Sequence, residues 1–366
     1  MNELLVVLYQ DRSATDEGTF FWGAKNRQYL LDEFSKDGFD VMCLVGENDP
    51  LPKNKDLLFI SDQAVICDRE TLKKRLEQFL SSEPGFAVKN LVHFVPRHDY
   101  DCIRIEAGHP VFLLELPQWD ESIVMDIACP EGYHKAQASY RKRIVEKHFN
   151  NNVRFLDPDH TYIGYHVKIG SNTLLYPGCI VEGETLIGEN SVIGPDCMIK
   201  DSDIGKYNTV SKSVIHDSKT GEHCNIGPFA YIRPGCMLHD HVKVGDFVEL
   251  KNSEIGEKTK IPHLTYIGDA SVGGNTNIAC GVITANYDGK KKYRTVIGND
   301  AFIGCNVALV APVTVHDGAY IAAGSTITKE VPPNALAIAR EVQVNKEDWV
   351  IKKGLQRNQK DDSKSS

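Results

Sequence analysis

The chain has 366 residues, a formal net charge of −9 and a pI near 5.8, and this length allows two domains with separate cores. The acidic balance argues against broad binding to nucleic acid, which needs a positive surface, and no stretch approaches the about 20 apolar residues of a transmembrane helix. Ten cysteines without a CxxC pair, and a first segment without a signal-peptide pattern, favour a cytoplasmic protein with reduced thiols.

The first 132 residues alternate strand-like and helix-like segments, which is typical of an α/β domain. The segment DRETLKKRLEQFL at 68–80 predicts an amphipathic helix capped by Asp68. Neither GxGxxG nor GxxxxGK[ST] occurs up to Ile60, so no glycine-rich phosphate loop is expected there. Short apolar runs that predict buried strands lie at 4–9, 57–60, 92–95 and 111–116.

Residues 133–152 predict a helix that links this domain to a third region at 153–340. Its sequence has few helix breakers and many charges, which indicates an exposed connecting helix, and the asparagines at 150–152 are a natural stop. The tail at 341–366 ends in the polar stretch KKGLQRNQKDDSKSS, which is expected to be disordered.

From Ile163 onward, a branched apolar residue recurs every six positions in three series. An amphipathic helix needs a period near 3.6 and a half-buried strand a period of 2, so period six indicates neither. It indicates a triangular solenoid, a left-handed parallel β-helix of hexapeptide repeats, in which each side of a coil points one branched side chain at a shared axis. The positions are Ile163, Ile169, Leu175, Val181, Ile187, Ile193, Ile199; Ile226, Ile232, Leu238, Val244, Leu250; and Ile297, Ile303, Leu309, Val315, Ile321, Ile327.

Glycine follows many of these residues, as in Ile163-Gly164 and Ile303-Gly304, and is expected to supply backbone freedom at the corners. Parallel strands lie about 4.8 Å apart, so about nine coils make an all-β prism about 45 Å tall. The period shortens to five residues in a few places and breaks at 284–295 (TANYDGKKKYRT). Because solenoids carry insertions as loops on a binding face, this polar loop is the first candidate for a site.

Three segments together resemble one enzyme family: HLTYIGDASVGGNTNIACGVITANYDG at 263–289, LVAPVTV at 309–315 and NALAIAR at 334–340. The family is GlmU, the bifunctional UDP-N-acetylglucosamine pyrophosphorylase and glucosamine-1-phosphate N-acetyltransferase, and the resemblance covers about residues 135–350. It implies an acetyltransferase that uses acetyl-CoA and a small sugar phosphate in UDP-N-acetylglucosamine biosynthesis. It also implies a homotrimer with active sites at subunit junctions.

The N-terminal part departs from the family. The family's longer first domain opens with a glycine-rich nucleotide loop, and here the equivalent stretch reads LYQDRSATDEGTFFWGAKNRQYL. Asp62 is the candidate relic of a metal-binding aspartate, and the metal-binding asparagine before the linker has no counterpart in IACPEGYH. The resemblance therefore implies a shortened, inactive nucleotidyltransferase-like domain, with magnesium needed only if that domain is active.

Acetyl transfer from a thioester to an amine needs a base, oxyanion donors, a clamp on the acceptor and a cradle for the coenzyme. The resemblance makes His263 the catalytic base, and histidine titrates near neutral pH. An arginine fork and lysine ammonium groups suit a phosphate. The acceptor-binding residues that the resemblance implies are Arg233, Lys251, Tyr266, Asn277 and, less specifically among three adjacent lysines, Lys292.

The coenzyme-binding residues implied by the resemblance include two departures from the family. Ala279-Cys280-Gly281 replaces glycine-alanine-glycine, and Cys280 still supplies a backbone N–H for an oxyanion. Cys305 stands where the family has serine, and a thiol is a poorer hydrogen-bond partner than a hydroxyl. The implied coenzyme set is Cys280, Asn286, Tyr287, Cys305, Ala323 and Arg340.

Three rival interpretations remain open at this stage. The pair His239 and His241 could chelate zinc, as in the carbonic anhydrases that share this fold, but no third ligand is evident. The chain could retain uridylyltransferase activity as well, which the missing glycine-rich loop argues against. It could instead be a non-catalytic trimeric scaffold descended from the enzyme, which the joint presence of His263, Arg233 and Lys251 argues against.

Overall fold

The computed structural model describes residues 130–356 continuously and, before residue 130, eleven strands. Five of these strands form one sheet in the order β4-β1-β5-β8-β7, in which β1 pairs parallel with β4 and β5, and β8 pairs antiparallel with β5 and β7. The strands are β1 (Leu4–Tyr9), β2 (Phe20–Phe21), β3 (Ala24–Lys25), β4 (Asp40–Cys43), β5 (Asp56–Ser61), β6 (Ala64–Ile66), β7 (Phe86–Val88), β8 (Val92–Val95), β9 (Ile103–Glu106), β10 (His109–Phe112) and β11 (Val124–Asp126).

The strands predicted at 4–9, 57–60 and 92–95 are confirmed as β1, β5 and β8. The strand predicted at 111–116 begins earlier, because β10 covers His109–Phe112. The helix predicted at 68–80 and the metal-ligand candidate Asp62 lie outside the described residues.

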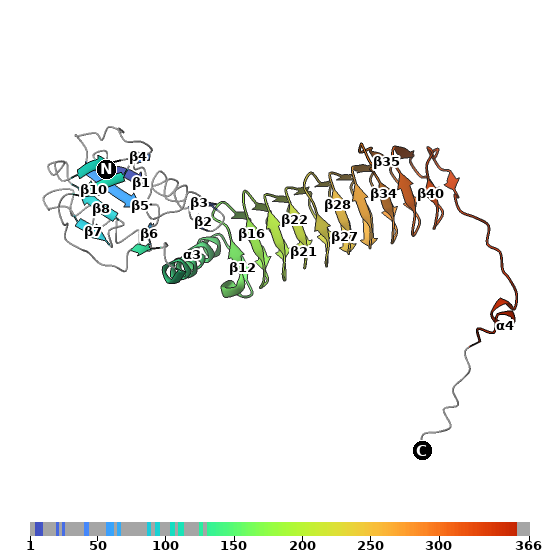
Figure 1. Cartoon of the computed structure of the whole chain (residues 1–366), viewed down its shortest axis with the longest axis horizontal. Helices are drawn as coiled ribbons and strands as arrows, with labels where there is room; N and C mark the ends of the chain where they lie inside the picture. Colours follow the sequence, from blue (N-terminus) through green and yellow to red (C-terminus); the bar gives the residue numbers. More distant parts are fainter. Residues whose placement is uncertain are drawn as a thin grey trace, which may run out of the picture.

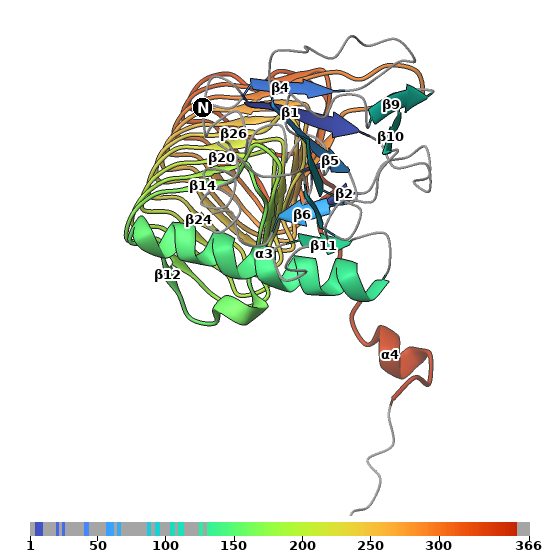
Figure 2. The same cartoon turned by 90° about the vertical axis from the view of Figure 1, so that its left-hand side faces the viewer.

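The linker helix α3 spans Pro130–Asn150, so it begins three residues before the predicted start and ends at the first of the three asparagines. It is not an exposed connector along its whole surface, since Ile144 and Val145 are buried and His148 is only 2% exposed. Figure 2 shows α3 lying across the first coil of the solenoid. This packing gives the solenoid a cap at its N-terminal end, which protects the first coil's core.

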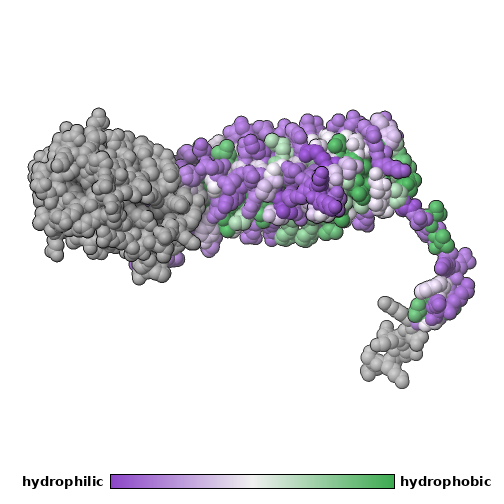
Figure 3. Space-filling view, turned by 45° about the horizontal axis from the view of Figure 1, so that its top comes forward, coloured by the Kyte–Doolittle hydropathy of each residue, from purple (hydrophilic) through white to green (hydrophobic). Residues whose placement is uncertain are grey.

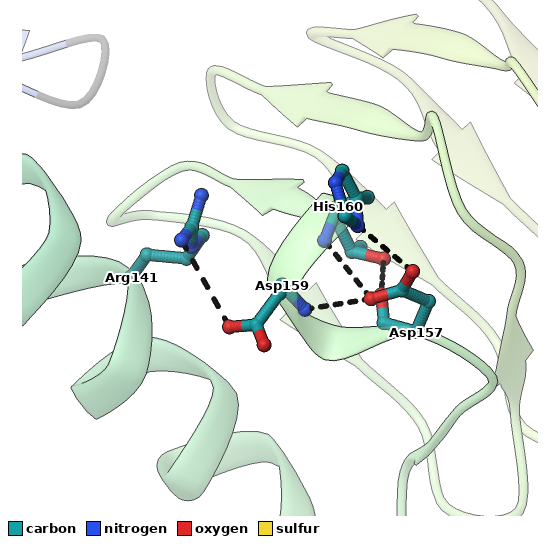
Figure 4. A network of polar contacts seen from close by, with 5 residues as sticks. Arg141, Asp157, Asp159 and His160 are labelled. Atoms are coloured by element: carbon teal, nitrogen blue, oxygen red, sulfur yellow. Dashed lines mark hydrogen bonds and ion pairs between the residues drawn. The ribbon is translucent and has the colours of Figure 1, made fainter.

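The polar contacts of this cap involve the 3-10 helix η2 (Pro158–His160) in the first coil. Asp157 caps η2 by accepting from the backbone N–H groups of Asp159 and His160 at 3.1 and 3.3 Å, and its other oxygen lies 2.8 Å from His160 Nδ1. Arg141 of α3 reaches toward Asp159, with 3.9 Å between the charged groups (Figure 4).

From residue 154 the chain winds into a parallel β-helix with three faces (Figure 1). The predicted parallel β-helix of hexapeptide repeats is confirmed. We call its three parallel sheets I, II and III, with 11, 10 and 9 strands respectively. These counts correspond to about ten coils, one more than the repeat pattern predicts.

Sheet I consists of β12 (Arg154–Phe155), β15 (Leu174–Leu175), β18 (Val192–Ile193), β21 (Thr209–Val210), β24 (Asn225–Ile226), β27 (Lys243–Asp246), β30 (Lys260–His263), β33 (Asn277–Ile278), β36 (Phe302–Ile303), β39 (Tyr320–Ile321) and β41 (Leu336–Ala337). Sheet II consists of β13 (Tyr162–Ile163), β16 (Ile180–Glu182), β19 (Met198–Lys200), β22 (Val214–His216), β25 (Tyr231–Ile232), β28 (Glu249–Lys251), β31 (Tyr266–Gly268), β34 (Ile283–Ala285), β37 (Ala308–Val310) and β40 (Thr326–Ile327). Sheet III consists of β14 (Lys168–Ile169), β17 (Leu186–Ile187), β20 (Asp203–Ile204), β23 (Lys219–Thr220), β26 (Met237–Leu238), β29 (Glu254–Ile255), β32 (Ala270–Val272), β35 (Thr295–Ile297) and β38 (Val313–Val315).

Every apolar position of the six-residue series is at most 7% exposed, so the predicted core is confirmed. Burying each branched side chain contributes roughly 1.5–3 kcal/mol. The apparent gap in the series between Ile199 and Ile226 is filled by Ile204, Val210, Ile215 and Thr220, which are also buried. The repeat therefore continues through this stretch, with a threonine at one core position where the other repeats have an aliphatic residue.

Most glycines that follow a residue of the series serve a different purpose from the predicted one, whereas Gly194, with a φ of 105°, does supply the predicted backbone freedom. Gly170 does not have a positive φ, but a methyl group on it would lie 2.4 Å from the backbone nitrogen of Glu189 in the next coil. The left-handed corner positions are held mostly by other residues, such as Asn172 and Asn190 with φ of 58° and 59°. Glycine is thus needed for the close approach of successive coils.

This close approach predicts that Gly170→Ala lowers the free energy of unfolding by about 1–3 kcal/mol, the usual cost of overpacking. Gly164→Ala is the matched control, because a methyl group there meets its nearest atom, Glu182 Cα, at 3.3 Å. Urea unfolding followed by circular dichroism measures both variants. Equal destabilisation by the two substitutions would contradict the close-approach argument.

Beyond β41 the chain leaves the prism as an extended arm that carries the short helix α4 (Trp349–Lys352) (Figure 1). The tail predicted to be disordered overlaps this helix at Lys352, and residues 357–366 lie outside the described residues. Among the described residues, no helix is both long enough and apolar enough to cross a membrane.

Candidate functional site

Four of the predicted site residues form a column along one edge of the prism, at or just after the last residues of the sheet I strands. Backbone hydrogen bonds join the successive coils here, from Leu264 N to Asp246 O, Asn306 N to Cys280 O and Gly324 N to Cys305 O, at 2.8–2.9 Å. Neighbours in the column are therefore about one strand spacing, roughly 4.8 Å, apart. We call this set the edge column; its members are Asp246, His263, Cys280, Cys305 and Ala323.

His263, the predicted base, ends strand β30, and its imidazole is exposed. Its Nδ1 lies 2.5 Å from Oδ1 of Asp246, which ends β27 in the coil below and is its direct partner in the strand register. The hydrogen bond to His263 lowers the pKa of the Asp246 carboxyl. An ionised carboxylate can only accept, so Nδ1 is the donor and Nε2 is the free position.

Sequence reasoning missed Asp246. The available signal was the coil length, because Asp246 and His263 are 17 residues apart, one coil with a five-residue side.

The predicted acceptor-binding cations lie on sheet II. Arg233 follows β25 and Lys251 ends β28 one coil further on, so the two residues are neighbours in register. The Arg233 guanidinium donates from Nη1 to Oε1 of Glu249 at 2.6 Å and lies 5.9 Å from the centre of the Tyr231 ring. Its remaining N–H donors are available for an anion.

The inserted loop adds Lys292 to these cations. Tyr287 and Lys292 pair as an antiparallel bridge, and the Asp288 carboxylate accepts from the N–H groups of Lys290 and Lys291 at 2.7 Å each, which makes the loop a tight turn. The neighbouring Lys292 is the main cause that lowers the pKa of Lys251, and Arg233 adds to it. Of three adjacent lysines, Lys292 is thus the one that joins the sheet II cluster.

Tyr266 begins β31, and its hydroxyl lies close to Gly268 at the end of the same strand. A methyl group on Gly268 would lie 2.3 Å from the Tyr266 hydroxyl and 2.9 Å from Asn286 Nδ2, so Gly268 leaves the space that both side chains occupy. Asn286 is 9% exposed and donates to Asp269 Oδ2 at 2.5 Å. Its amide therefore holds the loop to the coil rather than standing free toward solvent.

The remaining predicted residues are not all gathered at this place. Asn277 begins β33 on the outer face of sheet I, a different face from that of Tyr266. Tyr287 is largely exposed and donates its hydroxyl to Gly289 O at 2.7 Å. Arg340 lies beside Gly324, next to the last member of the edge column, with Cδ 4.0 Å from where a methyl group on that glycine would be.

Cys305 is exposed and Cys280 is half-buried, so both edge-column thiols can be reached by a ligand. The resemblance implies that Cys305 contacts the coenzyme, and on that expectation Cys305→Ser lowers the KM for acetyl-CoA, because a hydroxyl is the better hydrogen-bond partner. A neutral hydrogen bond is worth about 0.5–1.5 kcal/mol, or roughly 2- to 10-fold. Steady-state thiol release measures this KM, with the KM for the amino sugar as the internal control; an unchanged KM for acetyl-CoA would count against the prediction.

The histidine pair considered for zinc has separate partners. His239 Nε2 lies 2.8 Å from Glu254 Oε1, whereas the ring of His241 stacks on that of His223 with centroids 4.9 Å apart. Within residues 130–356 and the eleven earlier strands, no group of three or more metal-ligating side chains comes together.

Two family models match parts of the solenoid. One is described as the GMPPB C-terminal domain and matches residues 163–261, and the other as the bacterial transferase hexapeptide (six repeats), which matches residues 294–329. Among solved structures, UDP-N-acetylglucosamine O-acyltransferase (LpxA) from Moraxella catarrhalis aligns with 48% of this chain and 70% of its own, at 18% identity and a TM-score of 0.31.

Curated relatives match more closely. The bifunctional protein GlmU of Clostridium acetobutylicum is 57% identical over 215 residues, 59% of this chain and 47% of that protein. The bifunctional protein GlmU of Clostridium botulinum is 53% identical over 274 residues, 74% of this chain and 59% of that protein. The chain thus spans about half the length of the curated relatives it matches. These matches confirm the resemblance to the GlmU family, at 53–57% identity over 59–74% of the chain.

Proposed function

We propose that this chain transfers the acetyl group of acetyl-CoA to the amine of glucosamine-1-phosphate, giving N-acetylglucosamine-1-phosphate for UDP-N-acetylglucosamine synthesis. The observation that carries the proposal is the placement of an oriented histidine beside a cluster of three cations. His263 and Tyr266 are three residues apart across one corner, and Arg233, Lys251 and Lys292 gather on the adjoining face. The similarity to GlmU proteins supports the same reaction.

In this proposal the cations bind the phosphate and His263 takes the proton of the attacking amine at Nε2. The amine nitrogen forms a bond to the thioester carbonyl carbon, the C–S bond breaks, and the protonated His263 returns its proton to the departing sulfur, so that coenzyme A leaves as the thiol. The backbone N–H of Cys280 is our candidate donor for the oxyanion, and the rest of the edge column with Arg340 is the candidate path of the coenzyme. No acyl-enzyme is required, because the nucleophile is the substrate's own amine.

A thiol-release assay with the purified chain and several amino sugars tests the substrate. We expect turnover with glucosamine-1-phosphate and much slower turnover with glucosamine or glucosamine-6-phosphate, because the cation cluster is fixed relative to His263. Mass spectrometry of the product distinguishes acetyl transfer from thioester hydrolysis. Equal rates with unphosphorylated glucosamine would overturn the assignment of the cluster.

The loop lysines provide a sharper test of phosphate binding. Lys292→Met is expected to raise the KM for the sugar phosphate by about 10-fold or more, since a hydrogen bond to a charged group is worth about 1.5–3 kcal/mol. Lys290→Met is the matched control, because Lys290 is exposed and, among the described residues, only its backbone N–H has a contact, to Asp288. A similar KM change in both variants would indicate a diffuse charge effect and contradict the specific role of Lys292.

We further propose that the chain acts as a homotrimer in the cytoplasm. Asn277 lies on sheet I, a different face from that of Arg233 and Lys251 in its own chain, so a second copy would have to supply it. Apolar side chains also stay exposed at successive corners, with Phe229 and Phe247 stacked at 5.5 Å between centroids and Leu264 next in line. Green apolar patches interrupt the hydrophilic surface of the solenoid (Figure 3). The six cysteines of the described solenoid are free thiols, which fits a reducing compartment.

Light scattering coupled to size exclusion tests the assembly. We expect a mass about three times the 40.8 kDa of the chain. Phe247→Lys should shift the mass toward that of the monomer, because a charge buried in an apolar interface is costly. A wild-type mass of a single chain would exclude the trimer.

A further inference from the structure

Histidine–carboxylate contacts such as that between Asp246 and His263 occur several times in this solenoid. The Asp246–His263 contact differs from the others in its position. The imidazole of His239 meets Glu254 at 2.8 Å and that of His160 meets Asp157 at 2.8 Å, both away from the sheet II cations. Only Asp246 among these carboxylates sits in the edge column, directly beneath the proposed base. Its partner histidine precedes Tyr266 of the acceptor cluster by three residues.

We propose that Asp246 is the positioning residue of the catalytic base: it fixes the His263 ring and the tautomer in which Nε2 is free to take the amine proton. The proposal rests on the acetyl transfer proposed above. Asp246 touches neither substrate in this scheme and acts only through His263.

Two features of the backbone make this contact a rigid one. Asp246 and His263 are register partners at the ends of paired strands, and the hydrogen bond from Leu264 N to Asp246 O, at 2.9 Å, holds the two coils together at that point. The Thr265 hydroxyl also donates to the His263 carbonyl at 2.6 Å, which fixes the chain just after the histidine. The paired strands of the solenoid therefore hold the Asp246 carboxylate next to His263 Nδ1, without a mobile loop.

The other nearby carboxylate has a different partner. Glu249 lies one strand away on sheet II and accepts from Arg233 at 2.6 Å, so its oxygen is engaged by the acceptor cluster. Asp246 has a short side chain and lies at the end of its strand. Its Oδ1 is 2.5 Å from His263 Nδ1, the distance of a charge-assisted hydrogen bond. Such a bond both selects one tautomer and stabilises the imidazolium that forms when His263 accepts a proton.

The test compares Asp246→Asn with Glu254→Gln, which removes the charge from the matched pair at His239. In the thiol-release assay we expect kcat of Asp246→Asn to fall by at least about 10-fold and at most about 10⁴-fold, the loss known for an Asp→Asn change beside a catalytic histidine. Both KM values should stay within about twofold, and Glu254→Gln should behave as wild type. A kcat for Asp246→Asn within twofold of Glu254→Gln, or a change confined to KM, would overturn the proposal.

A second measurement does not depend on the reaction. Nitrogen-15 NMR of histidine-labelled protein, assigned by the loss of one resonance in His263→Gln, reports which ring nitrogen carries the proton. We expect Nδ1–H in wild type and a loss of that preference in Asp246→Asn, since an amide can also donate to Nδ1. If wild type shows no acetyl transfer but this tautomer switch is seen, the proposed function has failed and the positioning contact stands; a wild-type Nε2–H tautomer overturns the positioning role.

Discussion

Replacement of His263 by alanine is expected to reduce kcat for acetyl transfer by about 10²- to 10⁴-fold, the usual contribution of a positioned general base. The side chain is exposed, and among the residues that the structure describes its one polar contact is with Asp246, so its loss should leave the solenoid core intact. Binding of both substrates should change little, because the phosphate-binding cations and the remaining edge column are unaltered. The effect should therefore appear in kcat rather than in either KM.

His239→Ala is the control for this experiment. His239 is a second exposed histidine paired with a carboxylate at a corner of the same prism, but it lies on sheet III, remote from the sheet II cations. Thiol release in this variant should match the wild type, and circular dichroism should show both variants folded. Undiminished turnover in His263→Ala would exclude His263 as the base. This conclusion would hold whether or not the assigned acceptor-binding residues are correct.

The core of the solenoid could be predicted because one local rule repeats in every coil. Each six-residue side buries one branched residue, and no long-range information is needed to place Ile163 or Ile327 inside. The same rule explains the misjudged glycines: their identity is set by contact with the next coil, as between Gly170 and Glu189, and not by their own dihedral angles. The six-residue rule describes one side of a coil at a time, so it does not predict contacts between coils.

The candidate site shows the same limit. His263 and Lys251 could be assigned from their motifs, but their partners lie a coil away, and five-residue sides make that separation variable. Asp246 and His263 are 17 residues apart, whereas Arg233 and Glu249 are 16 apart. The choice of Lys292 among three lysines depended on the turn that Asp288 closes, which composition alone does not specify.

The linker helix was predicted to be exposed, and its partial burial was missed for a related reason. A charged helix sequence does not reveal which polar side chain the tertiary fold buries. His148 of α3 is 2% exposed, and neither ring nitrogen has a hydrogen-bond partner among the residues that the structure describes. Burial, with the charge of Lys147 adding to it, lowers the pKa of His148 to about 4 from its ordinary 6.5. The neutral ring is therefore the form compatible with the docked helix.

This pKa shift predicts that the docking of α3 weakens on acidification. Between pH 6.5 and about 4 the undocked form binds a proton that the docked form does not, so stability is complete above pH 6.5 and is lost as the pH falls through this window. The shift corresponds to about 3 kcal/mol at most. Hydrogen-exchange protection of α3, corrected for the intrinsic rate, should fall between pH 7 and 4.5 in wild type and much less in His148→Leu. His134→Leu, at an exposed position of the same helix, should keep the wild-type pH dependence, and an unchanged profile in His148→Leu would show that another group controls the cap.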